Sequence, residues 1–171
     1  MLRKAGKSQK TAPAVLIPKI VIAAIAIVAF CFPTMAVTYH CSQGEEWWRH
    51  VAAVFSHANI FHLAANLYCM ALIRFKADWI TAFIIALCAT FLPAPVWSWK
   101  EMGFVIMPTC GLSGMILAAI AAEWAKVRDF KSMLKWLVVP ILPLTIVPNI
   151  NTSIHLYCIF IAFLTKRYII K

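Results

Sequence analysis

Two side chains of this 171-residue sequence, Ser113 and His155, could together hydrolyse an acyl bond. A serine hydroxyl is a weak nucleophile until a neighbouring base takes its proton, and an imidazole can be that base. Both residues stand in apolar stretches, where a polar group is costly and usually faces a cavity for a purpose. The six acidic residues fall in predicted loops or at helix ends, so none can orient the histidine. We therefore expect a dyad rather than a Ser-His-Asp triad.

Two further polar residues in an apolar stretch, His62 and Asn66, could stabilise the negative charge that forms in acyl transfer. They are four positions apart, so they share one helix face, and both side chains can donate hydrogen bonds. Ser113 is expected at a helix N-terminus, where free N–H groups and the positive dipole favour a developing oxyanion. We predict an oxyanion site made by His62, Asn66 and the Ser113 N–H. The alternative for His62 and Asn66 is hydrogen bonding between helices that stabilises the bundle.

Six apolar stretches are predicted to position these residues as helices. Counting about 1.5 Å per residue from the basic end of each helix places His62, Ser113 and His155 at similar depths of about 16–20 Å. The stretch that begins at Gly111 would extend only about 21 Å, too short for a bilayer core of about 30 Å. Ser113 should therefore begin a helix inside the membrane, below an irregular segment, 100–110. The predicted helices cover residues 20–37, 57–73, 79–97, 111–124, 134–148 and 152–165.

The composition indicates a polytopic membrane protein. Hydrophobic residues make up 63% of the chain and the mean hydropathy is +0.84, too apolar for a soluble domain. The net charge of +10 could suggest nucleic-acid binding, but the basic residues lie between the apolar stretches, which favours a topological role. With the N-terminus in the cytoplasm, only Arg49 and Lys100 of the sixteen basic residues fall in outer loops. We therefore predict an all-α bundle of six transmembrane helices with both termini cytoplasmic. It would comprise a basic tail, 1–13, and a membrane domain, 14–171.

Several motifs resemble those of the rhomboid intramembrane serine proteases. The segment 57–66, HANIFHLAAN, resembles the second-helix motif of that family, and 111–114, GLSG, resembles its G-x-S-G segment. His155 stands where the sixth helix of the family carries the general base, and Trp48-Arg49 resembles a pair in the first outer loop. The resemblance implies hydrolysis, on the outer side, of a peptide bond in or near a substrate's transmembrane segment. It also implies a small residue at the cleaved bond, a locally unstable substrate helix and no cofactor.

Supporting roles are expected for residues around these motifs. Gly111 and Gly114 should allow close backbone approach near the nucleophile. His57 should hold the outer loop rather than take part in the chemistry. Trp47 and Trp48 should anchor the chain at the membrane interface.

The sequence also departs from the family pattern at three positions. Where the family carries glycines after its base histidine, this chain has Cys158 and Ala162, which would keep the sixth helix slightly further from the fourth. Leu117 replaces an aromatic residue against which the histidine packs in many members. These changes would affect the geometry of the dyad, and with it the rate, without removing a catalytic group.

Other functional classes are less consistent with the sequence. A catalytically silent rhomboid-like protein that binds transmembrane helices is the main alternative, although neither Ser113 nor His155 is replaced. A small transporter is disfavoured because the sequence contains no acidic relay and no inverted repeat. Three histidines in apolar stretches could suggest zinc, but no Glu or Cys is placed to complete a site. We expect a bacterial inner-membrane protein whose partners are transmembrane substrates and the lipid bilayer.

Overall fold

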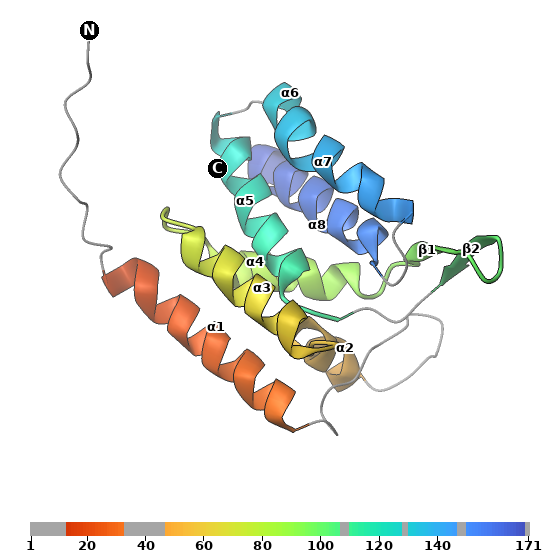
Figure 1. Cartoon of the computed structure of the whole chain (residues 1–171). Helices are drawn as coiled ribbons and strands as arrows, with labels where there is room; N and C mark the ends of the chain where they lie inside the picture. Colours follow the sequence, from red (N-terminus) through yellow and green to blue (C-terminus); the bar gives the residue numbers. More distant parts are fainter. Residues whose placement is uncertain (1–12, 33–46, 107–109, 128–129, 147–149, 170–171) are drawn as a thin grey trace, which may run out of the picture.

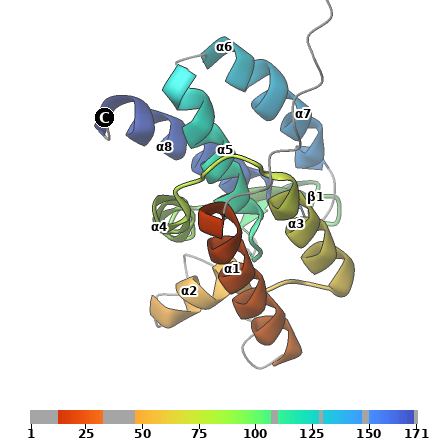
Figure 2. The same ribbon diagram turned by 90° about the vertical axis from the view of Figure 1, so that its left-hand side faces the viewer.

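The chain forms a predominantly helical bundle built around α5 (Ser113–Val127) (Figure 1). α5 contacts α3 (Ile60–Leu72), α4 (Trp79–Ala89) and α8 (Thr152–Leu164). α1 (Pro13–Cys31) packs against α3 at one side of the bundle (Figure 2). The computed structural model describes residues 13–32, 47–106, 110–127, 130–146 and 150–169.

α5 is central because its apolar side chains face several neighbouring helices, and its charged residues, Glu123 and Lys126, lie near its end. A helix that is apolar over most of its surface belongs in a core. Most of these side chains are small, which lets neighbouring backbones approach closely. The buried residues of α5 include Met115, Ile116, Ala118, Ala119, Ala121 and Ala125.

α3, α5 and α8 all begin at the same end of the bundle, which we term the site end. At the opposite end, Asp78 before α4, Lys126 of α5 and Lys166 after α8 surround one pocket. Asp78 caps α4 by accepting hydrogen bonds from the Thr81 N–H (3.1 Å) and hydroxyl (2.7 Å). These two bonds, with a further contribution from Lys166, hold the pKa of Asp78 below its ordinary value. We term this opposite end the basic end.

Lys19 connects α1 to the end of α3 at the basic end. Its side chain is buried, and Nζ donates to the carbonyl of Ile73, the residue that caps α3, and to that of Ala71 at 3.4 Å. The last carbonyls of a helix have no partner within it, so a charged donor there satisfies groups that would otherwise be orphaned. Lys19 therefore has a structural role in addition to the topological one predicted from its charge.

A β-hairpin follows α4 and modifies the predicted all-α fold. The helix predicted over 79–97 ends at Ala89, because Pro93 and Pro95 cannot continue it. β1 (Pro95–Ser98) instead pairs antiparallel with β2 (Gly103–Ile106), with Trp97 opposite Phe104. The hairpin covers part of the segment 100–110, which was predicted to be irregular. It lies beyond the helices at the site end (Figure 1).

The remaining helices differ from prediction mainly at their ends. α3 begins at Ile60 rather than 57, because Asn59 caps it by accepting from the His62 N–H at 2.9 Å. An additional helix, α2 (Trp47–Phe55), forms where an outer loop was expected. The first helix begins earlier than predicted, at Pro13, and ends at Cys31. Of the predicted basic tail 1–13, residues 1–12 lie outside the described part of the chain, as do 33–37 and 147–148 of two predicted helices.

The fifth predicted helix, 134–148, is irregular. A short α6 (Phe130–Met133) leads into a π-helical turn (Leu134–Val138), then α7 (Val139–Ile141) and a 3₁₀ turn (Leu142–Ile146). Pro140 lies in α7, where its ring would clash with the carbonyl four residues earlier in a regular α-helix. That carbonyl belongs to Trp136, inside the π turn, whose wider winding accommodates the proline.

Within the described residues, no helix combines the length and the hydropathy that a membrane crossing requires.

α5 and α8 approach closely where Gly114 faces Cys158. A Cβ added at Gly114 would lie 3.0 Å from the Cys158 Sγ, whereas carbon atoms in contact are usually about 3.5–4.0 Å apart. Cys158 and Ala162 are both fully buried in this contact region. The absence of a side chain on α5 thus makes room for the Cys158 sulfur on α8.

We predict that Lys19→Met lowers the free energy of unfolding by about 1–3 kcal/mol, because buried carbonyls at the end of α3 lose a charged donor. The matched control is Lys126→Met, since Lys126 pairs with Glu123 at the exposed surface and such pairs contribute about 0–1 kcal/mol. Denaturation of the purified proteins in mixed detergent micelles measures the free energy of unfolding of both variants. Equal stabilities of the two variants would contradict the role assigned to Lys19.

We also predict that Gly114→Ala destabilises the wild-type background but stabilises a Cys158→Ala background. With the sulfur removed, the added methyl has room, and alanine is favoured over glycine in a helix by about 1 kcal/mol. The thermal stabilities of the four proteins of this double-mutant cycle should reveal a coupling of about 1 kcal/mol or more. Additive effects would show that the two residues do not compete for the same space.

Candidate active site

Ser113 and His155, 42 residues apart in the chain, are in direct contact at the site end. Ser113 Oγ lies 2.7 Å from His155 Nε2, within hydrogen-bonding distance. Ser113 is the first residue of α5, and His155 lies in the first turn of α8, which Asn151 caps by accepting from the Ile154 N–H at 3.3 Å. Nε2 can therefore receive the serine proton if the imidazole proton resides on Nδ1.

Gly111 brings the chain before Ser113 against α3. Its φ of +113° lies in a region that L side chains rarely adopt. A Cβ there would lie 2.8 Å and 2.9 Å from two ring atoms of His62, and 3.4 Å from Asn66 Nδ2. The Gly111 N–H donates to the Ala53 carbonyl at 2.9 Å, which joins this turn to α2 as well. Only glycine fits this turn without strain, and the fit places His62 and Asn66 beside the segment that leads into Ser113.

Asn66 presents a buried donor next to the dyad. Its side chain is 5% exposed, and its Nδ2 makes no hydrogen bond within the described part of the chain. A buried amide without a partner costs about 1–3 kcal/mol, so an acceptor is expected when a ligand is bound. His62 lies one turn earlier on the same helix, with its Nε2 also directed at the Gly111 turn. Together they provide two donors near Ser113.

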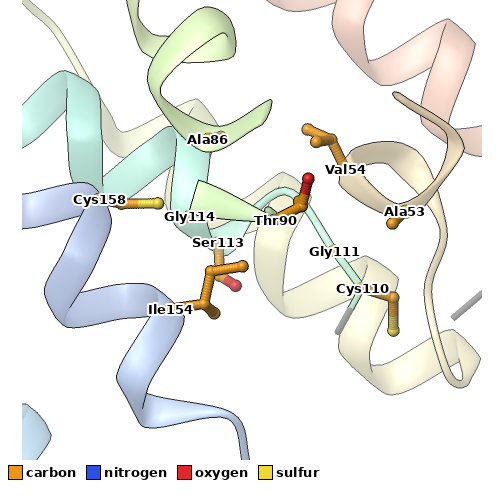
Figure 3. A pocket seen from close by; sticks show the side chains of 10 residues that line it. All are labelled: Ala53, Val54, Ala86, Thr90, Cys110, Gly111, Ser113, Gly114, Ile154 and Cys158. Carbon is orange, nitrogen blue, oxygen red and sulfur yellow. The ribbon is translucent and has the colours of Figure 1, made fainter. Parts of the chain in front are cut away.

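A pocket beside Ser113 is lined by side chains from α2, α4, α5 and α8 (Figure 3). Its walls are mostly small and apolar, and Thr90 is the polar exception besides Ser113. The lining residues are Ala53, Val54, Ala86, Thr90, Cys110, Gly111, Ser113, Gly114, Ile154 and Cys158. Such a pocket suits a small apolar group close to the Ser113 hydroxyl.

Thr90 belongs to a hydrogen-bonded pair that the sequence analysis did not identify. Its hydroxyl donates to the Leu87 carbonyl at 2.6 Å and accepts from His50 Nδ1 at 2.9 Å. The buried His50 ring also stacks on Phe91, with centroids 3.6 Å apart. The pair attaches α2 to the end of α4. The available indication was Thr90 itself, a polar residue shortly before the prolines that interrupt an apolar stretch.

The predicted supporting residues lie around this centre. His57 is buried, its Nδ1 lies 2.9 Å from the Phe55 carbonyl, and its ring packs edge-on against His62 at 5.0 Å. It thus contacts both the end of α2 and an oxyanion candidate. Trp48 and Arg49 lie on α2, with the guanidinium 5.4 Å from the Trp48 ring centroid, and neither lines the pocket.

A metal centre is not formed among the residues that the structure describes. No group of three or more His, Cys, Asp or Glu side chains is suitably placed there to hold an ion.

Comparisons with known proteins identify the family. No curated protein matches the sequence. The family profile described as the Rhomboid domain matches residues 44–166, a segment that includes all the site residues described above. The match covers most of the chain, and we conclude that this protein belongs to the rhomboid family.

Proposed function

We propose that this protein is an intramembrane serine endopeptidase that cleaves a peptide bond in or near the transmembrane segment of membrane-protein substrates. Family membership supports this class of activity in general. The observation that carries the proposal for this chain is the 2.7 Å contact between Ser113 Oγ and His155 Nε2. A serine hydroxyl paired with an imidazole, next to an apolar pocket and two side-chain donors, is the arrangement that acyl transfer needs.

In the proposed mechanism, Ser113 Oγ attacks the scissile carbonyl carbon while His155 Nε2 takes the hydroxyl proton. The carbon–nitrogen bond then breaks, and His155 gives its proton to the leaving amine, so that an ester remains on Ser113. A water molecule attacks this ester, again with His155 as the base. The second product leaves as a carboxylic acid and the Ser113 hydroxyl is restored.

The oxyanion formed in each attack would be stabilised by three donors: the Ser113 N–H, His62 and Asn66. The Ser113 N–H stands at the first turn of α5, where helix N–H groups have no carbonyl partner within the helix. The Asn66 amide has no hydrogen-bond partner in the described residues, so it can donate to substrate without breaking a bond. Donors arranged in advance require no reorganisation during the reaction.

The proposed topology has six spans, formed by α1, α3, α4, α5, the segment 130–146 and α8. The site end would face the outer side and the basic end the cytoplasm, with both termini cytoplasmic. The position of Lys19, Lys126 and Lys166 at the basic end supports this orientation, since cytoplasmic segments are enriched in basic residues. Exposed apolar side chains along α1, such as Ile20 and Val28, would contact lipid. A bacterial inner membrane remains our proposed location.

The decisive test is Ser113→Ala in liposomes that contain a model transmembrane substrate. We expect kcat to fall about 10³-fold or more and labelling by a fluorophosphonate probe to disappear, because both need the Ser113 oxygen. The control Ser132→Ala, which changes a serine of α6, should retain the wild-type kcat and the labelling by the probe. If the folded wild-type protein cleaves no member of a broad substrate panel and resists the probe, the catalytically silent, helix-binding alternative replaces this proposal.

A second test separates the oxyanion role of Asn66 from helix stabilisation. Asn66→Ala should lower kcat about 10²–10³-fold with little change in KM or stability, because its amide has no hydrogen-bond partner among the described residues. Asn59→Ala is the matched control on the same helix. It removes the cap of α3, so it should cost about 1 kcal/mol of stability while kcat stays within a few fold. An Asn66→Ala protein with normal kcat and reduced stability would instead support interhelical hydrogen bonding.

A further inference from the structure

Two hydroxyl groups on α8 flank His155 and bind the chain that follows α4. Ser153 Oγ donates to the Pro95 carbonyl at 2.6 Å, and the Tyr157 hydroxyl donates to the Pro93 carbonyl at 2.7 Å. Ser153 lies two residues before the imidazole and Tyr157 two residues after it. Both bonds join segments far apart in sequence and lie at the site end.

The spacing of donors and acceptors matches on the two sides. Ser153 and Tyr157 are four residues apart, so they project from one face of α8, separated by about 6 Å along its axis. Pro93 and Pro95 are alternate residues, and Ala94 between them precedes a proline and is therefore biased to an extended conformation. Alternate residues of an extended chain are about 6.6 Å apart and have their carbonyls on the same side. The spacing of the two hydroxyls along α8 therefore matches the spacing of the two proline carbonyls along the extended chain.

His155 lies on the opposite face of the helix from these two donors. At 3.6 residues per turn, a step of two residues is a rotation of about 200° around the helix axis. His155 is therefore separated by about 160° from both Ser153 and Tyr157. The two hydroxyls thus hold one side of the turn, while the imidazole on the other side meets Ser113 on α5.

We propose that Ser153 and Tyr157 are positioning residues that fix the rotation of the first turn of α8, and with it the placement of His155 Nε2 against Ser113 Oγ. The inference rests on the proposed function. A ring atom about 7 Å from the helix axis moves about 1 Å when the turn rotates by about 10°, given a Cα radius of about 2.3 Å. A displacement of this size can cost about 10²-fold in rate. Among the described residues, the polar side chain to which the His155 imidazole is hydrogen-bonded is that of Ser113.

The test compares Tyr157→Phe and Ser153→Ala with wild type in the rate of fluorophosphonate labelling. This reaction reports the activation of Ser113 by His155 without a protein substrate. Each variant should be labelled about tenfold more slowly, and the double variant more slowly still. Cleavage assays should show the loss in kcat rather than in KM. Both hydrogen bonds lie at the surface, so the free energy of unfolding should change by only about 1 kcal/mol for each.

Two control variants distinguish positioning from general weakening of the fold. Tyr68→Phe removes the hydroxyl of an exposed tyrosine on α3 and should be labelled at the wild-type rate. Ser153→Thr keeps a hydroxyl at the same position and should restore most of the rate lost in Ser153→Ala. Wild-type labelling rates in Tyr157→Phe and Ser153→Ala would overturn the inference but leave the proposed function intact. A folded wild type that is neither labelled nor active would overturn both.

Discussion

The hydrogen bond between Ser113 and His155 depends on the direction in which three helices run. α3, α5 and α8 all begin at the site end, so their first turns converge there. Each contributes polar groups from that turn or the next, and each has N–H groups with no carbonyl partner inside the helix. An antiparallel arrangement of any one of them would leave its polar side chains at the basic end, away from their partners at the site end. The position of each helix start is thus a requirement for the site.

Small residues allow these first turns to come close enough for Ser113 and His155 to form a hydrogen bond. Gly111 brings the chain before α5 onto His62 and Asn66 through a conformation that other residues rarely adopt. Gly114 accommodates the Cys158 sulfur, so α8 lies close to α5 one turn along from His155. The Cys158 side chain, which was expected to keep the sixth helix further from the fourth, is accommodated by a glycine on the facing helix. Close packing and hydrogen-bond geometry are established by the same few positions.

The connections outside the helices complete the arrangement at both ends. At the site end, the prolines after α4 end that helix and leave carbonyls that receive the hydroxyls of α8. At the basic end, Lys19 satisfies carbonyls of α3, and Asp78 caps α4. At the basic end, a helix end is thus satisfied by a group from a distant part of the chain or by a local cap. At the site end, the acceptors belong to the chain that follows α4.

The sequence by itself was sufficient to identify the polar residues in apolar stretches, the shared face of His62 and Asn66, and a helix beginning near Ser113. These follow from local spacing and from the cost of placing polar groups in apolar surroundings. The end of α4 at Ala89 and the β-hairpin were missed, because the hydrophobicity of 79–97 outweighed its prolines in the sequence analysis. Only the tertiary structure decided that Ser113 and His155 touch and that His50 binds Thr90. It also decided that Ser153 and Tyr157 bind carbonyls of the chain after α4. Such contacts join residues 40 or more positions apart, and local periodicity contains no information about the direction or rotation of one helix relative to another.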